Sequence, residues 1–254
     1  MKAILFDLDG VFYQGDVVIP GAAETVAWVQ QHSIPHLFVT NTTSRPRSSL
    51  LEKLSAMHIK TDEAHLFTPI IAAKTWLQSA GIKDNIALHI PEKTKIEFTE
   101  YSESIERPEA IIIGDLGEGW DYKVLNHIFR LLMENPDCPL IALGMNRYWQ
   151  AEDGLRLDVA PFIKALEYAS NRQALIMGKP DVNFFHAAIE KLGLSASDML
   201  MIGDDINGDI AAAQQSGLTA WLVRTGKFRL EDLQLDIHPD RVITSVAELP
   251  KYWE

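Results

Sequence analysis

Short apolar runs that alternate with longer segments of helical periodicity constrain the fold of this chain more than any other feature. The run AILFD at residues 3–7 is followed by a helical pattern at 22–31, and HLFVT at 36–40 is followed by another through Met57. This alternation is typical of β-strands joined by helical crossovers. The sequence therefore predicts an α/β fold built on a parallel sheet.

The same alternation returns near the end of the chain. We expect strands at 174–178, 199–203 and 219–223, with helices at 182–192 and 206–216 between them. Polar clusters follow the early and the late strands, and open parallel sheets bind ligands outside the carboxyl ends of their strands. The sequence therefore predicts a ligand site at that edge of the sheet.

The middle of the chain has the pattern of a second, smaller α/β unit. Its expected elements are strands at 86–90, 110–114 and 139–143 and helices at 122–133 and 159–169. Segments with polar strand ends flank this unit on both sides, so the simplest arrangement is one domain inserted into another. We predict a core domain at 1–80 and 174–254 and an inserted domain at 81–173.

Composition narrows the class of partner. The net charge of −12 argues against a nucleic-acid partner, because phosphate backbones are bound by clustered Lys and Arg. The single cysteine, Cys138, excludes an internal disulfide and fits a reducing compartment. The apolar run before Asp7 is too short for a signal peptide, and no uncharged run has the length of a membrane span. We therefore expect a cytoplasmic protein without a membrane partner.

The first polar cluster is DLDG, in which Asp7 and Asp9 directly follow the apolar run. In an extended chain residues i and i+2 project to the same face, about 7 Å apart. Two carboxylates held that close need a cation, a shared proton or a positive neighbour. The alternative interpretation is a strand end followed by an Asx-type turn at Gly10.

Two further clusters hold groups that could bind an anion. Thr40 and Asn41 end a predicted strand and could bind a phosphoryl oxygen, although Thr42 and its neighbours could equally cap a helix. Lys179, in the segment GKP, could neutralise a buried anion at another strand end. The alternative for this lysine is an exposed side chain before a proline that starts a helix.

The last cluster is GDDINGD at 203–209, which places Asp204, Asp205 and Asp209 directly after an apolar strand. Such a cluster is typical of a site for a hard cation held by oxygen ligands. An EF-hand is excluded, because Ile210 and Ser216 stand where that loop needs glycine and glutamate.

Other catalytic motifs have no support. GDLGEG at 114–119 has the wrong order for a dinucleotide loop, and Asp115 and Glu118 would repel a pyrophosphate. The sequence contains neither H-E-x-x-H nor G-x-S-x-G, which argues against a zinc protease or a serine hydrolase.

Together the four clusters resemble the motifs of the haloacid dehalogenase-like superfamily. The matching segments, in order, are DLDGV at 7–11, VTN at 39–41, GKP at 178–180 and GDDINGD at 203–209. The insertion between the second and third motifs is similar to that of subclass IIA, the NagD-like enzymes. The segments at 147–169 and 223–229 look like the haloacid-dehalogenase-like hydrolase domain-containing 2 type, a near relative of phospholysine phosphohistidine inorganic pyrophosphate phosphatase. The resemblance implies a Rossmann-like core with an inserted α/β cap of the C2 type.

The resemblance also implies catalytic roles. Asp7 would attack phosphorus to form an aspartyl-phosphate, while Asp9 would protonate the leaving oxygen and later deprotonate a water. Mg²⁺ would be held by the Asp7 side chain, the Asp9 backbone carbonyl and Asp204. Asp205 and Asp209 would support this metal shell from a second layer.

The implied phosphate ligands are Thr40, Asn41, Thr42 and Lys179, whose donors would stabilise charge on the transferring group. The sequence thus predicts a Mg²⁺-dependent phosphatase that hydrolyses a small phosphorylated metabolite. The alternative is a phospho-acceptor or ligand-binding protein with little turnover. Asn146 and Arg147 are candidate substrate contacts, with an ordinary loop as the alternative. Inserts of this kind can pair, which makes a homodimer an expectation.

Overall fold

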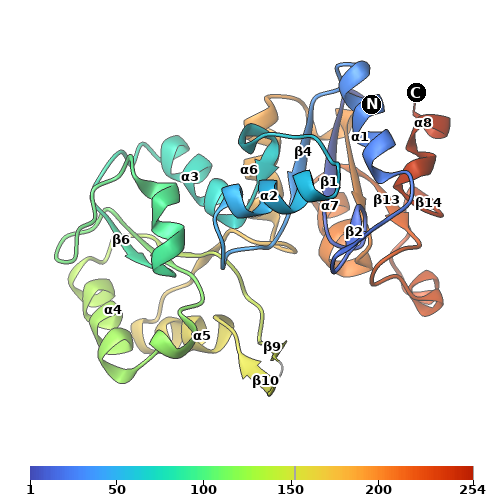
Figure 1. The fold of residues 1–254 in the computed structure, drawn as a ribbon. Coiled ribbons are helices and arrows are strands. Elements are labelled where there is room, and N and C mark those ends of the chain that lie inside the picture. The colour runs from blue at the N-terminus through green and yellow to red at the C-terminus, as the bar shows by residue number, and fades with distance from the viewer. Residues whose placement is uncertain (152, 254) are drawn as a thin grey trace. The chain divides into compact units, whose positions relative to one another are not determined.

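The computed structural model describes residues 1–151 and 153–253 and divides into two compact units (Figure 1). The first unit comprises Met1–Thr40, Arg47–Thr68 and Lys179–Glu254, and the second comprises Asn41–Pro46 and Pro69–Gly178. Helix α3 (Pro69–Ser79) thus groups with the second unit. The domain boundaries at 1–80, 81–173 and 174–254 stay a prediction.

The first unit contains a six-stranded parallel sheet in the order β14-β13-β12-β1-β4-β5. Its strands, in chain order, are β1 (Ala3–Asp7), β4 (His36–Val39), β5 (Leu66–Phe67), β12 (Met199–Gly203), β13 (Thr219–Val223) and β14 (Arg241–Ile243). The sequence pattern predicted four of these and missed the short edge strands β5 and β14. Because β1 lies centrally, between β12 and β4, the strand ends with polar clusters are neighbours at one edge.

Helices and a small hairpin complete this unit. They are the hairpin β2 (Tyr13–Gln14) and β3 (Val17–Val18) and the helices α1 (Ala22–Gln31), α2 (Arg47–Ala56), α6 (Val182–Leu192), α7 (Ala212–Gln215) and α8 (Leu249–Tyr252). Both ends of the chain belong to this unit, where α8 contacts α1 (Figure 1).

Side chains along β1 point alternately to the two faces of the sheet, and both faces are covered by other elements. Phe6 points to the face on which it packs with Phe12 and Phe38, with ring centroids 5.3–5.9 Å apart, together with apolar residues of α1 and α2. On β5, Phe67 packs edge-on against Phe184 of α6, at 5.3 Å. A sheet buried on both sides explains why its strands are continuous apolar runs.

The second unit has its own four-stranded parallel sheet, in the order β11-β8-β7-β6. Its strands are β6 (Ile86–His89), β7 (Ala110–Ile113), β8 (Leu140–Ala142) and β11 (Leu175–Ile176), and its helices besides α3 are α4 (Tyr122–Glu134) and α5 (Ala160–Ser170). A two-stranded hairpin, β9 (Tyr148–Ala151) and β10 (Gly154–Leu157), precedes α5. The predicted α/β fold with a second, smaller sheet is therefore confirmed.

One predicted strand belongs to a different sheet. We placed 174–178 in the core, but β11 pairs in parallel with β8, Leu175 opposite Ile141, in the smaller sheet. A short apolar run can pair with any strand edge that the fold presents, so its sequence does not specify its partner.

The predicted helix at 206–216 is also irregular. A π-helical turn, Ile206–Ala211, precedes α7 and is closed by the amide of Ile210 donating to the carbonyl of Asp205, at 3.2 Å. Such turns occur frequently at functional sites.

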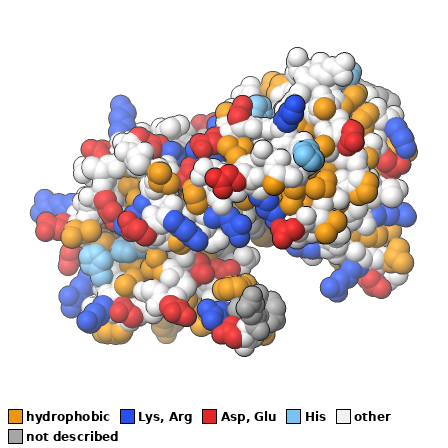
Figure 2. Space-filling view, in the orientation of Figure 1, with side chains coloured by type: hydrophobic (Ala, Val, Ile, Leu, Met, Phe, Trp, Pro, Cys, Tyr) orange, Lys and Arg blue, Asp and Glu red, His pale blue; other side chains and the backbone are white. Residues whose placement is uncertain are grey.

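On the face that Figure 2 shows, the two signs of charge are mixed. Lys and Arg side chains are interspersed with Asp and Glu on the face shown in Figure 2. Within the described residues, no helix is long and apolar enough to cross a membrane. Cys138 is buried and unpaired.

Candidate active site

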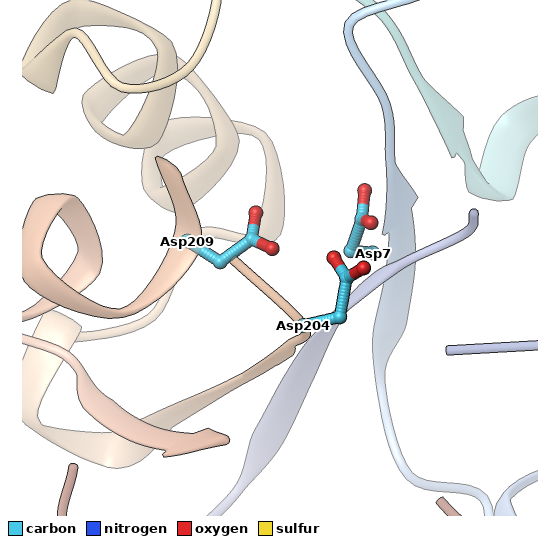
Figure 3. Close-up of side chains that lie close together, drawn as sticks. All are labelled: Asp7, Asp204 and Asp209. Carbon is cyan, nitrogen blue, oxygen red and sulfur yellow. The ribbon is translucent and has the colours of Figure 1, made fainter. Parts of the chain in front are cut away.

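Three buried carboxylates meet at the carboxyl edge of the six-stranded sheet. Asp7 ends β1, Asp204 follows β12, and Asp209 projects from the π-helical turn (Figure 3). The pairing of Phe6 with Ile202 aligns the ends of the two strands, and one oxygen of each carboxylate lies within 4.8 Å of the others. The structure therefore brings together acids that are about two hundred residues apart in the sequence.

Lys179 supplies a positive charge to this cluster. Its Nζ donates to Asp7 Oδ1 at 2.5 Å and to Asp209 Oδ1 at 2.7 Å, and its side chain is 7% exposed. The lysine is therefore a buried ion-pair partner and not an exposed side chain. Lys179 contacts two of the three carboxylates, and a single ammonium among three acids leaves a negative charge for a further cation to balance.

The pKa values of these groups reflect burial first and the neighbouring charges second. Burial raises the pKa of Asp7 to about 7, with Lys179 opposing the shift and Asp209 adding to it. Burial likewise raises the pKa of Asp204 to about 6, although the backbone amide of Lys227 opposes it. For Lys179 burial acts against the charged form, but Asp209 and Asp7 outweigh it and raise the pKa. Crowded carboxylates of this kind favour binding of a cation.

The donor set fits a divalent hard metal ion. Asp204 Oδ1 is buried and has no hydrogen-bond partner among the residues that the structure describes. A buried acceptor left unsatisfied is costly unless a ligand completes it. Because all three groups offer carboxylate oxygens, they suit Mg²⁺ or Ca²⁺ better than a soft metal.

A loop after β13 closes around Asp204, although none of its residues was among the predicted site residues. The hydroxyl of Thr225 donates to the carbonyl of Gly10, and the amide of Lys227 donates to Asp204 Oδ2 at 2.7 Å. Between them, Gly226 has φ +67 and leaves no room for a Cβ beside the Asp204 carboxylate and Gly10. The available signal was the segment VRTGKFR, which we used only for the resemblance.

Replacement of Gly226 by alanine is expected to lower the hydrolysis of p-nitrophenyl phosphate, the type of activity that the sequence predicts, at least about tenfold, because the new methyl group must displace the Asp204 carboxylate. The matched control is Gly193→Ala, since Gly193 has φ +66 but nothing within 4 Å of an added Cβ. Both substitutions place an alanine at a positive φ, which costs about 1 kcal/mol. Only Gly226→Ala also forces the added methyl group into the Asp204 carboxylate. If kcat/KM falls equally in the two variants, the assignment of the Gly226 loop to the site is contradicted.

The other predicted site residues are distributed between the two units. Thr40 is buried at the end of β4 in the first unit, whereas Asn41 and Thr42 group with the second unit. The Asp9 side chain is exposed and is not part of the carboxylate cluster. Asp205 accepts from the amides of its own turn, with Gly208 N at 2.8 Å, and from Lys227 Nζ at 3.2 Å. The catalytic and binding roles of these residues stay predictions.

Asp209 lies closer to the other acids than we expected. We assigned it to a supporting layer with Asp205, but one of its carboxylate oxygens lies within 4.8 Å of an oxygen of Asp7 and of an oxygen of Asp204. It also accepts the Asp205 amide at 3.2 Å and Lys179 at 2.7 Å. These contacts let Asp209 orient Lys179 while it adds charge to the cation site.

Comparison with known proteins identifies the family. The family model described as haloacid dehalogenase-like hydrolase matches residues 4–102, and one described as HAD-hydrolase-like matches residues 176–249. Phospholysine phosphohistidine inorganic pyrophosphate phosphatase from Bos taurus is 36% identical over 244 residues, covering 94% of this chain and 88% of the relative. The chain belongs to the haloacid dehalogenase-like hydrolases.

A second relative agrees with this assignment, and a solved structure shares the fold. Haloacid dehalogenase-like hydrolase domain-containing protein 2 from Mus musculus is 35% identical over 244 residues, covering 96% of this hydrolase and 92% of the relative. NagD from Escherichia coli K-12 has a similar fold, with a TM-score of 0.85 at 21% identity over 98% of both chains. The predicted resemblance is thus confirmed, and this hydrolase has curated relatives that are phosphatases by name.

Proposed function

We propose that this haloacid dehalogenase-like hydrolase is a Mg²⁺-dependent phosphatase that cleaves a small phosphorylated metabolite through an aspartyl-phosphate. The observation that carries the proposal is the Asp7 carboxylate, buried at the sheet edge against Lys179 and within 4.8 Å of two further acids. A carboxylate beside a fixed ammonium and a cation site suits attack on an anionic phosphoryl group.

The reaction divides into two displacements. In the first, an Asp7 oxygen bonds to phosphorus while the bond to the leaving oxygen breaks, and Asp9 gives that oxygen its proton. In the second, Asp9 takes a proton from water, the hydroxide bonds to phosphorus, and the aspartyl bond breaks to regenerate Asp7. Lys179 and Thr40 bind the phosphoryl oxygens, together with Asn41 and Thr42.

Asp7 and Asp204 would hold the metal ion with the Asp9 carbonyl, while Asp209 and Asp205 support the site. When bound, Mg²⁺ would neutralise the charge of the phosphoryl group so that two anions can approach each other. We also propose that residues 81–173 form the cap that distinguishes one phosphorylated substrate from another.

Removal of divalent metal is expected to abolish hydrolysis of p-nitrophenyl phosphate. Three carboxylates balanced by one lysine would repel a phosphate dianion unless a cation is present. The assay follows released p-nitrophenolate in protein treated with EDTA and then supplied with Mg²⁺. Full activity in EDTA would contradict the metal requirement, whereas a single stoichiometric burst with Mg²⁺ would indicate a phospho-acceptor without turnover.

The substrate is best sought by a screen of phosphorylated metabolites. The Bos taurus relative is named for phospholysine, phosphohistidine and pyrophosphate, so these compounds form the first group of the screen, with sugar and nucleoside phosphates as the second. A substrate is identified by a kcat/KM value well above that for p-nitrophenyl phosphate, together with its loss in the Asp7→Asn variant.

A further inference from the structure

Helix α2 carries a lysine whose ammonium group contacts the hairpin that follows the first polar cluster. Lys53 Nζ lies 4.2 Å from the centroid of the Tyr13 ring and 3.7 Å from Asp16 Oδ1. Tyr13 is 5% exposed, whereas the Asp16 side chain is 98% exposed. Because solvent screens the exposed ion pair, the contact with the buried ring is the stronger of the two.

Tyr13 in turn braces the backbone that carries Asp9. The amide of Gly10 donates to the carbonyl of Tyr13 at 2.6 Å, and an isolated β-bridge pairs Asp9 with Tyr13. On its other side Gly10, at φ +89, lies so close to the Asp204 carboxylate that no Cβ would fit. The Asp9–Gly10 segment is therefore held between the cation site and Tyr13.

We propose that Lys53 is a positioning residue for Asp9. Its ammonium holds the Tyr13 ring, the Tyr13 backbone holds the Asp9–Gly10 segment, and this segment sets the direction of the Asp9 carboxyl group toward the leaving oxygen. Lys53 acts through Tyr13 and not on the substrate. The inference rests on the proposed function, in which Asp9 is the general acid.

Leaving groups of different basicity test this role. Nitrophenolate departs with little help from an acid, whereas the alkoxide of glycerol 2-phosphate must be protonated as it leaves. Lys53→Met keeps the length of the side chain and removes its charge. We expect it to lower kcat/KM about tenfold for glycerol 2-phosphate, equivalent to about 1.4 kcal/mol, and less than twofold for p-nitrophenyl phosphate. The value of kcat/KM is used because it reports the step in which the leaving group departs.

Conservative variants separate positioning from general damage. Lys53→Arg keeps a cation over the Tyr13 ring. It is expected to show the wild-type ratio of the kcat/KM values for the two substrates. Tyr13→Leu removes the ring and should reproduce the Lys53→Met ratio. Combining Tyr13→Leu with Lys53→Met should add no further loss, because both changes remove the same contact.

The matched control is Lys60→Met, which removes an exposed lysine of the same unit. It is expected to leave both kcat/KM values unchanged. Thermal unfolding of each variant shows whether the fold persists. An equal loss for the two substrates in Lys53→Met, or no loss for either, would overturn the positioning role.

Asp9→Asn distinguishes failure of this inference from failure of the proposed function. We expect a larger loss for glycerol 2-phosphate than for p-nitrophenyl phosphate in that variant. If Asp9→Asn shows the selective loss and Lys53→Met does not, only the role of Lys53 is wrong. If Asp9→Asn shows no selectivity, the general-acid assignment itself is wrong, and the inference with it.

Discussion

Replacement of Asp7 by asparagine is expected to lower kcat for p-nitrophenyl phosphate by about 10⁴-fold or more. The carboxamide has nearly the same shape, but it cannot attack phosphorus and offers a weaker ligand to a cation. Lys179 keeps its second partner, since it also contacts Asp209 at 2.7 Å. The loss should therefore arise from the missing nucleophile and not from collapse of the cluster.

Two measurements make this expectation specific. Mass spectrometry of acid-quenched wild-type protein should find a phosphoryl group on the peptide that contains Asp7, and the variant should show none. Asp236→Asn, at a fully exposed carboxylate, is the control for loss of one negative charge. Retention of wild-type turnover in Asp7→Asn would remove Asp7 as the nucleophile.

Replacement of Lys179 by methionine is the second large effect that we expect, a fall in kcat/KM of about 10³-fold. Its ammonium links Asp7 and Asp209, at 2.5 and 2.7 Å, and in the reaction that we propose it binds a phosphoryl oxygen. Lys191→Met, at an exposed position on α6, is the control and should keep full activity.

Lys179→Met should also have a lower free energy of unfolding than the wild type, and Mg²⁺ should restore part of the loss. Without the ammonium, Asp7 and Asp209 are buried side by side as unpaired charges, which costs about 3 kcal/mol of unfolding free energy. Mg²⁺ should recover a larger part of that loss in Lys179→Met than it adds to the wild type, because it replaces the missing positive charge. Urea unfolding with and without Mg²⁺ measures both quantities. An equal Mg²⁺ effect on the two proteins would show that Lys179 and the cation site are not coupled.

The sequence was most informative where local pattern and chemistry agree. The elements β1, α1, β4, α6, β12 and β13 lie where the apolar runs and the helical periods predicted them. A buried parallel strand must be apolar on both faces, so its sequence is distinctive even in a single chain. The motif acids Asp7, Asp204 and Asp209, and Lys179, do meet at one sheet edge.

Other features could not be predicted from local pattern. The strand β11 has an apolar sequence that fits either sheet, and only the packed fold pairs it with β8. The loop of Thr225, Gly226 and Lys227 has no catalytic signature, because its contribution is made by a backbone amide, a hydroxyl and the lack of a Cβ. Every residue type except proline carries the same backbone donor, so the sequence does not reveal where these donors point.

By itself, then, the sequence determined the family, the α/β class and the identity of the charged groups, because apolar periodicity and motif order are properties of the chain. Only the tertiary structure decided that a carboxylate oxygen of Asp209 lies within 4.8 Å of one of Asp7 and one of Asp204, and that Lys53 reaches the ring of Tyr13, whose backbone pairs with Asp9. Coulombic and ring contacts depend on distances of a few ångströms. Those distances are set by strand register and helix packing, which no short segment of the chain specifies.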